Sequence, residues 1–254
     1  MARFIEVSKA LKKEKILLIC KSDLIPYYQD YGFLYGGKSK SKHGGFEWHE
    51  MYLLLNTVNE IIRVMNMRSI CLASSSPRRQ QILKELGLDF VVSHPVEFKE
   101  KLSGSDPEAL VCHNALGKVK EVAKKYKDSI IIGCDTVVTF NNEILGKPLT
   151  PDNANAMLKK LSGNCHSVFS GLVVIDTQSN KELVGHDITE VKFRNLSEKE
   201  INDYVASGEP LDKAGAYGIQ ECGGEFVESI KGSFSNVVGL PKELLTRFLT
   251  ELII

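Results

Sequence analysis

Eight polar residues of this sequence combine the side-chain types that bind and cleave phosphate anhydrides. Four are cationic, two are carboxylates and two are neutral hydrogen-bonding groups: Ser74, Arg78, Arg79, Glu100, Lys118, Asp135, Lys147 and Gln220. Guanidinium and ammonium groups bind phosphate oxygens, whereas carboxylates suit Mg²⁺, which also keeps water and phosphate oxygens as ligands. A carboxylate also deprotonates a water that attacks phosphorus. The set therefore predicts a polyphosphate site with a divalent metal, if the fold brings these residues together.

The first of these residues lie in the segment 69–86, SICLASSSPRRQQILKEL. An apolar run predicts a short buried strand, three serines follow it, and Pro77 stands where a helix would begin. Arg78 and Arg79 then fall on the first helical turn, where the helix dipole disfavours cations. An anionic ligand held by free backbone N–H groups would explain them. The alternative is a solvated helix start with two surface arginines.

Asp135 interrupts the most apolar strand-like segment of the chain, SIIIGCDTVVTF at 129–140. Continuous β-branched residues predict a strand that is buried on both faces. A buried carboxylate without a partner is costly, so Asp135 needs a cation, hydrogen-bond donors or a proton. The alternative is a carboxylate at a strand end that accepts hydrogen bonds from the backbone.

Two lysines lie in segments that can bring them to the same place. Lys118 belongs to a helix expected over 108–126, with Asp106 as its N-cap. It falls near the edge of the apolar stripe of that helix. The alternative is a structural role, in which the lysine stem covers apolar surface and the ammonium reaches water. Lys147 stands between Gly146 and a proline, where the backbone is restricted.

The composition excludes several classes of protein. Lysine plus arginine equals aspartate plus glutamate at 32 each, so the chain lacks the basic excess of a nucleic-acid-binding protein. Six scattered cysteines form no CxxC pair, which favours buried thiols over disulfides or a zinc site. No apolar run approaches the roughly 20 residues that span a bilayer, and the first residues do not resemble a signal peptide. We therefore expect a cytoplasmic protein without a nucleic-acid or membrane partner.

Residues 1–66 differ in character from the remainder and predict a small α/β extension. Their pattern indicates two strands and a short helix next to a basic, glycine-rich loop at 36–45. The segment CKSDLIPYYQDYGFLYGGKSKSKHGGFEWHEM resembles the C-terminal part of a GCN5-related N-acetyltransferase, in which a tyrosine at the position of Tyr28 can serve as general acid. The acetyl-CoA loop of that family, Q/R-x-x-G-x-G/A, has no match upstream. We therefore expect a partial acetyltransferase-like segment without activity.

Residues 67–254 resemble the Maf family of nucleoside triphosphate pyrophosphatases. The resemblance rests on the pair Glu97 and Glu100, the helix that carries Lys118, and seven motifs in family order: LASSSPRR (72–79), GCDTVV (133–138), LGKP (145–148), LSG (161–163), TEVKFR (189–194), DKAGAYGIQ (212–220) and GSFSNVVGLP (232–241). It implies an α/β fold, in which a mixed sheet with flanking helices forms a cleft between two lobes, related to inosine triphosphatases. It also implies hydrolysis between the α- and β-phosphates, which yields the monophosphate and pyrophosphate.

The same resemblance assigns a role to each candidate residue. Asp135 accepts the proton of the attacking water, and Glu100 joins it in binding Mg²⁺ or Mn²⁺. The phosphate groups are held by Ser74, Arg78, Lys118 and Lys147. The base is selected by Arg79, Thr136 and Gln220. A carboxamide such as that of Gln220 suits a pyrimidine, because it can donate to a carbonyl and accept from N3–H.

The motifs DKAGAYGIQ and SNVVGLP resemble the dTTP/UTP branch of the family more than the branch that acts on 7-methyl-GTP. The resemblance therefore predicts dTTP, UTP and modified uridine triphosphates as substrates, and removal of non-standard nucleotides as the purpose. It also suggests a homodimer, because dimers occur in the family. Two alternatives remain at this stage: a bifunctional protein with N-acetyltransferase activity, and a non-catalytic nucleotide-binding regulator.

Overall fold

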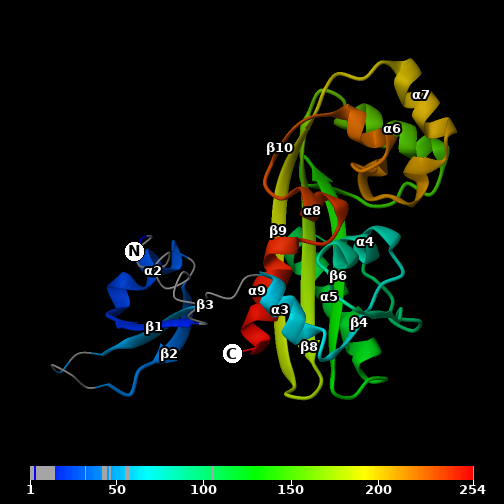
Figure 1. Cartoon of the computed structure of the whole chain (residues 1–254). Helices are drawn as coiled ribbons and strands as arrows, with labels where there is room; N and C mark the ends of the chain where they lie inside the picture. Colours follow the sequence, from blue (N-terminus) through cyan, green and yellow to red (C-terminus); the bar gives the residue numbers. More distant parts are fainter. Residues whose placement is uncertain are drawn as a thin grey trace. The chain divides into compact units, whose positions relative to one another are not determined.

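The computed structural model describes residues 3, 15–31, 33–41, 45, 47–54, 58–104 and 106–253. The chain divides into two compact units, Met1–Ile61 and Ile62–Ile254 (Figure 1). Helix α3 (Val58–Met65) spans this division. Within the described residues, no helix is long and apolar enough to cross a membrane.

The first unit contains an antiparallel three-stranded sheet in the order β1-β3-β2. Its elements are β1 (Lys15–Cys20), η1 (Ser22–Leu24), α2 (Ile25–Gln29), β2 (Leu34–Lys38) and β3 (His49–Leu54). A small apolar core is formed by Ile16, Cys20, Phe33 and Met51. Strand β2 occupies the start of the segment expected as a glycine-rich loop, because its pairing with β3 overrides the low strand propensity of glycine. The likeness to an acetyltransferase stays a prediction.

The second unit is built on a seven-stranded mixed sheet. The strand order is β10-β9-β8-β6-β4-β5, and β7 pairs with β6. Strand β4 is parallel to both of its neighbours, whereas the other pairs are antiparallel. The strands are β4 (Ser69–Leu72), β5 (Val91–Val92), β6 (Ser129–Phe140), β7 (Glu143–Leu145), β8 (Cys165–Asp176), β9 (Lys181–Phe193) and β10 (Val227–Lys231). Strand β6 coincides with the apolar segment predicted to be a buried strand, which is confirmed.

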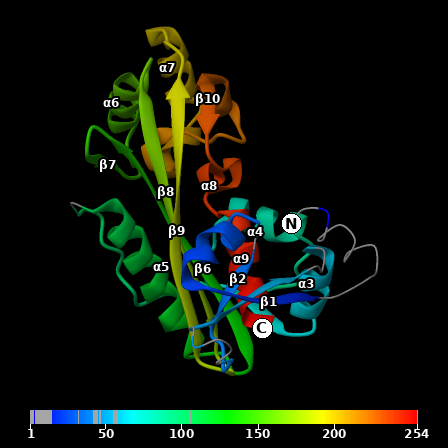
Figure 2. The same ribbon diagram turned by 90° about the vertical axis from the view of Figure 1, so that its left-hand side faces the viewer.

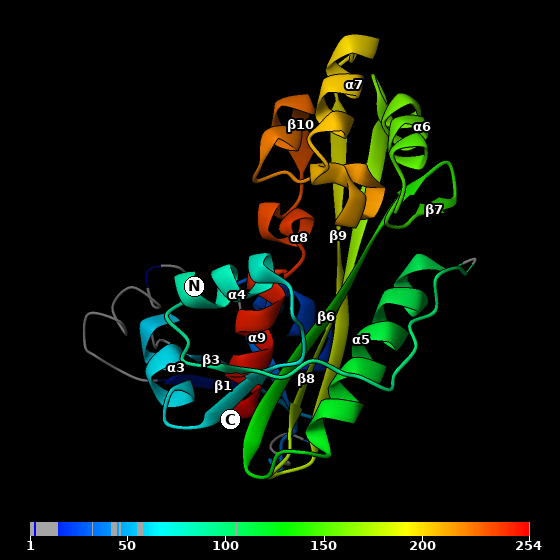
Figure 3. The ribbon, with the colours of Figure 1, turned by 90° about the vertical axis from the view of Figure 1, so that its right-hand side faces the viewer.

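Helices α5 (Pro107–Ala123) and α9 (Lys242–Ile253) cover opposite faces of this sheet (Figures 2 and 3). Two glycines permit the close approach of these helices to the sheet. A Cβ at Gly171 of β8 would lie 2.4 Å from the backbone carbon of Val111 in α5, and one at Gly185 of β9 would lie 3.0 Å from Phe248 in α9. Because Gly185 pairs with the residue after Gly171, the two glycines face opposite sides of the sheet.

Three long strands, β6, β8 and β9, run through two lobes of this unit (Figure 1). The core next to α5 includes Ile131 of β6 and Val173 of β8. The other core includes Val138 and Val168 of the same two strands. The remaining elements are α4 (Pro77–Glu85), α6 (Pro151–Leu161), α7 (Glu198–Ala206), η3 (Glu209–Asp212), η4 (Ala214–Ala216), η5 (Cys222–Phe226) and α8 (Phe234–Val238). The predicted mixed sheet with flanking helices and two lobes is therefore confirmed.

Candidate active site

The candidate site lies where the central strand β6 has an open edge. Along one edge, β8 pairs with residues 130–139 without a break. Along the other edge, β4 pairs with 129–132 and β7 with 138–140, and no strand among the described residues pairs with 133–137. A pocket of 790 Å³ opens here, and its lining includes Asp135 and Thr136. Because alternate strand residues point to opposite faces, these two neighbours extend to opposite sides of β6.

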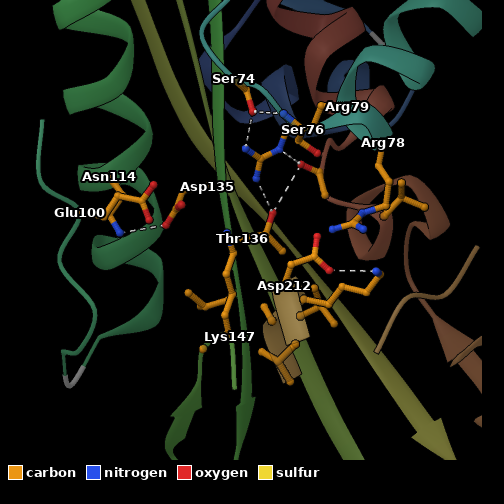
Figure 4. A pocket seen from close by; sticks show the side chains of 18 of the residues that line it. Ser74, Ser76, Arg78, Arg79, Glu100, Asn114, Asp135, Thr136, Lys147 and Asp212 are labelled. Atoms are coloured by element: carbon orange, nitrogen blue, oxygen red, sulfur yellow. Dashed lines mark hydrogen bonds and ion pairs between the residues drawn. The ribbon is translucent and has the colours of Figure 1, made fainter. Parts of the chain in front are cut away.

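Asp135 projects toward α5 and lies beside Asn114 (Figure 4). Two side chains of this helix, Asn114 and Lys118, bind its carboxylate. Lys118 Nζ lies 2.6 Å from Asp135 Oδ1, and Asn114 Nδ2 donates to Oδ2 at 2.9 Å. The same ammonium lies 2.7 Å from Glu100 Oε1, so one cation bridges two carboxylates. Asn114 and Lys118 reach one point because they are one turn apart on the helix. The predicted need of Asp135 for a cation and donors is confirmed, and the Lys118 ammonium is buried rather than solvated.

Asn114 was not predicted from the sequence. Its Oδ1 accepts the Lys101 N–H and its Nδ2 donates to the Lys101 carbonyl, both at 2.9 Å, so it ties the segment after Glu100 to Asp135. Glu121 holds the preceding residues, because its carboxylate accepts backbone N–H groups of residues 96–98. These bonds, that of Val96 first, lower the pKa of Glu121. The sequence offered one indication of the role of Asn114, because this amide side chain stands four residues before Lys118 on a predicted helix.

Thr136 projects to the other face of β6, where the Arg79 guanidinium joins three elements. Arg79 Nε donates to the Gly239 carbonyl at 2.8 Å, Nη1 to Ser74 Oγ at 3.2 Å and Nη2 to Thr136 Oγ1 at 3.3 Å. Figure 4 shows the guanidinium between Ser74 and Thr136. Arg79 is thus fixed at the pocket wall by its contacts with the serine turn, β6 and the end of α8.

The turn between β4 and α4 has the predicted form of a strand, a serine turn and a helix start. Pro77 is the first residue of α4, and the side chain of the N-cap residue Ser76 makes no capping hydrogen bond. Ser74 Oγ accepts the Ser76 N–H at 3.2 Å instead. The amides of Arg78 and Arg79 therefore lack a side-chain cap, and residues 74–79 all line the pocket. Such a helix start suits an anion.

Two further charged residues of the pocket lining, Asp212 and Lys213, come from the segment after α7. Arg78 Nη1 lies 3.7 Å from Glu221 Oε1, and Lys213 Nζ lies 3.1 Å from Glu221 Oε2 and 3.0 Å from Asp212 Oδ1. Burial tends to raise the pKa of Asp212, but the hydrogen bond and charge of Lys213 and the charge of Arg78 outweigh it, so that the pKa is lowered. Lys147 is exposed at the pocket and makes no ion pair within the described part of the chain.

The charge of the pocket differs from that of the whole chain. Its lining holds three carboxylates and six cationic side chains: Glu100, Asp135 and Asp212, with Arg78, Arg79, Lys101, Lys118, Lys147 and Lys213. Because the whole chain has no net charge, this excess of positive charge is local. A cleft with one predominant sign of charge concentrates ligands of the opposite sign. The arrangement therefore suits a polyanion with several phosphate groups.

Every predicted site residue lines this pocket except Gln220. Gln220 is exposed and follows Ile219, which does line the pocket, so the predicted contact of Gln220 with a base stays a prediction. Ser170 is a second residue that sequence reasoning missed, and it bonds to Thr136 from β8 at 2.8 Å. Its only signal was a hydroxyl residue within an apolar strand pattern.

The two predicted metal ligands offer carboxylate oxygens that converge on the Lys118 ammonium. Hard oxygen donors of this kind fit Mg²⁺ or Mn²⁺. Among the described residues, no group of three or more His, Cys, Asp or Glu side chains could hold a metal. Glu100 and Asp135 supply only two carboxylates, so a metal bound there would take its other ligands from water and from substrate phosphates.

A comparison with known protein families shows to which family the chain belongs. A family model described as Maf-like protein matches residues 69–252. The chain belongs to this family. The Maf-like match lies within the second unit and includes all the residues of the pocket. The resemblance inferred from the motifs is confirmed.

Similar proteins of known name match about three quarters of the chain. A protein of Dictyoglomus thermophilum named dTTP/UTP pyrophosphatase is 48% identical over 186 residues, which are 73% of this chain and 96% of that protein. One of Clostridium botulinum (strain Kyoto / Type A2) with the same name is 45% identical over 195 residues, 73% of this chain and 98% of that protein. The solved structure of a HAM1 protein from Coxiella burnetii aligns with 73% of this chain and 100% of its own, at 20% identity and a TM-score of 0.39.

Proposed function

We propose that this Maf-like protein hydrolyses dTTP, UTP and modified uridine triphosphates to the nucleoside monophosphate and pyrophosphate. The observation that carries the proposal is the pocket across β6, with the bridged carboxylates Asp135 and Glu100 on one side and the serine turn with its arginines on the other. The name dTTP/UTP pyrophosphatase of the relatives supports the same reaction. We assign it the purpose of removing non-standard nucleotides from the precursor pool.

The phosphate groups lie, in this proposal, along the cationic wall of the pocket. Ser74 and Arg78 hold them at the start of α4, where uncapped amides add further donors. Lys147 reaches them from the loop after β7, and Lys118 from α5. A phosphate bound between these groups places the α–β anhydride near Asp135, which shares the Lys118 ammonium.

Asp135 is the proton acceptor in the proposed reaction. Each of its carboxylate oxygens accepts one hydrogen bond, from Lys118 or from Asn114, and keeps a second lone pair. A water oxygen forms a bond to phosphorus, the bond from that phosphorus to the bridging oxygen breaks, and the water proton passes to Asp135. Lys118 and Asn114 keep the carboxylate oriented throughout.

Pyrophosphatases of the Maf family depend on a metal ion. We assign Mg²⁺ or Mn²⁺ to Glu100 and Asp135, whose oxygens fit such an ion. When bound, it supplies positive charge that offsets the charge of the phosphates. Activity is expected to disappear with a chelator and to return with Mg²⁺ or Mn²⁺, and full activity in excess chelator would contradict the assignment.

The base is selected, in this proposal, by Arg79 and Thr136 of the pocket lining, together with Gln220, which follows the lining residue Ile219. The substrate assay incubates the protein with dTTP, UTP, CTP or GTP and Mg²⁺, and measures monophosphate and pyrophosphate. We expect release from dTTP and UTP above the other two nucleotides. Pyrophosphate release at the background rate from all four would refute the proposed function.

The variant Asp135→Asn tests the proton acceptor. It keeps the size of the side chain, and we expect kcat to fall by roughly 10²- to 10⁴-fold, the usual contribution of a general base. Asp203→Asn is the matched control, because Asp203 is exposed on α7 and lies outside the pocket lining. A rate for Asp135→Asn within a few-fold of the control would show that another group takes the proton.

The homodimer and the cytoplasmic location remain part of the proposal. Light scattering after size-exclusion chromatography tests the first, and a mass of a single 28.3 kDa chain across the working concentration range would contradict it.

A further inference from the structure

Ser170 lies beneath the pocket at a point where the direction of a hydrogen bond matters. It is on β8, directly opposite Thr136 of β6, and its side chain is fully buried. Its Oγ lies 2.8 Å from Thr136 Oγ1 and 3.1 Å from the backbone carbonyl of Asn236 in α8. Ser170 itself does not line the pocket, whereas Thr136 does.

The carbonyl of Asn236 decides which hydroxyl donates. A carbonyl oxygen only accepts, so the bond at 3.1 Å uses the single Ser170 proton. Thr136 must then give its own proton to Ser170 across the 2.8 Å contact.

The reverse arrangement is weaker. Ser170 would donate to Thr136, and Thr136 would donate to the Gly239 carbonyl at 3.4 Å, a long distance for a bond between oxygens. The reverse order would also remove the bond from Ser170 to Asn236. The first arrangement therefore holds.

This direction determines what Thr136 offers to a ligand. Its proton is used on Ser170, and one of its two lone pairs accepts Arg79 Nη2 at 3.3 Å. One lone pair is left, so Thr136 can accept one further hydrogen bond and has no proton to donate. An N–H group of a ligand complements this oxygen, whereas an unprotonated ring nitrogen does not.

We propose that Ser170 is a positioning residue for base selection, because it takes the Thr136 proton and so makes Thr136 an acceptor for a pyrimidine N3–H. Uracil and thymine carry a proton on N3, and cytosine has a lone pair there. The inference rests on the proposed function, since it places the base at Thr136. A site discriminates most strongly against an analogue that leaves one of its buried polar groups without a hydrogen-bond partner.

The test compares kcat/KM for UTP and for CTP in the wild-type protein and in Ser170→Ala. The variant frees the Thr136 hydroxyl to turn its proton toward the pocket. We expect the UTP-to-CTP ratio to fall on the order of ten-fold, which corresponds to one hydrogen bond. A purely structural role for Ser170 would lower both values alike and leave the ratio unchanged.

Ser167→Ala is the matched control, because Ser167 is on the same strand opposite Thr139 and outside the pocket lining. Its ratio is expected to equal that of the wild type. Ser170→Cys provides a second variant of similar volume whose thiol is a weak acceptor, and it should shift the ratio in the same direction. In a Thr136→Val background, Ser170→Ala should have no further effect on the ratio.

An unchanged ratio in both Ser170 variants, or a wild-type protein that favours CTP, would overturn the inference. If the wild-type protein hydrolyses no nucleoside triphosphate, the proposed function fails separately. The same ratio is then taken from the Kd values of UTP and CTP by titration calorimetry. A Kd ratio that Ser170→Ala leaves unchanged, or no binding of either nucleotide, would also overturn the inference.

Discussion

Replacing Lys118 by methionine removes the cation that bridges Asp135 and Glu100. Methionine keeps the length and apolar stem of the side chain, so the change is confined to the ammonium. The ammonium lies 2.6 Å from Asp135 Oδ1 and 2.7 Å from Glu100 Oε1. Without it, a buried carboxylate keeps only the hydrogen bond from Asn114 and faces a second carboxylate.

The size of the effect follows from the burial of each partner. The side chains of Lys118 and Asp135 are 8% and 9% exposed, and breaking a buried pair by removing one partner costs about 3–5 kcal/mol. Glu100 is 46% exposed, so its share adds at most about 1 kcal/mol. We therefore expect the free energy of unfolding of the second unit to fall by about 3–6 kcal/mol.

Urea unfolding at neutral pH, without nucleotide or metal, measures this difference. The midpoint should move to lower urea while the m-value stays constant, since the same surface is exposed. Far-ultraviolet circular dichroism is the suitable signal. The single tryptophan, Trp48, belongs to the first unit, so its fluorescence is not a direct probe of the second.

Two further variants decide whether the buried charge is the cause. Lys120→Met removes another lysine of α5, whose partner Glu182 lies 3.2 Å away at the surface, and should change stability by less than about 1 kcal/mol. Adding Asp135→Asn to Lys118→Met removes the uncompensated carboxylate and should restore most of the loss. A loss for Lys118→Met no larger than that for Lys120→Met would refute this account of the site.

Two other predictions concern the stability of the second unit. Burial lowers the pKa of His166 from 6.5 to about 4, so below pH 6.5 the unfolded chain binds a proton that the native state does not. Stability should fall by roughly 3 kcal/mol from this group as pH drops from 6.5 to about 4, and urea unfolding of His166→Gln should lack that part of the pH dependence. Gly171→Ala places a Cβ 2.4 Å from the Val111 backbone of α5 and should cost about 1–3 kcal/mol, whereas Gly146→Ala meets no atom within 4 Å and serves as the control. Equal midpoints for the two glycine variants would contradict the close approach.

Local signals in the sequence were sufficient to predict the helices and strands around the site. The continuous run of β-branched residues predicted β6, because a strand that is buried on both faces carries apolar residues at consecutive positions. Asp106 accepts the Ala109 N–H at 3.1 Å, as expected of the N-cap of α5. The requirement of Asp135 for partners followed from the cost of burying a charge, although the identity of Asn114 as one partner did not.

The interactions that the sequence did not predict depend on which distant residues become neighbours. Ser170 bonds to Thr136 because β8 and β6 pair in one register, and a shift of one residue would turn it to the other face. Asn114 reaches both Asp135 and Lys101 only when α5 lies on the sheet. Strand β2 formed in a glycine-rich segment because β3 supplied hydrogen-bond partners.

The three strands shared by both lobes also restrict how the second unit can move. Ile131 and Val138 belong to different cores and lie on one strand, and Val173 and Val168 do so on the next. Because the two cores share these strands, opening one core also breaks backbone hydrogen bonds that support the other. Amide protons in both cores should therefore exchange through a common global opening. Closure around a nucleotide is correspondingly limited to twisting of a continuous sheet and to movement of the turns that line the pocket.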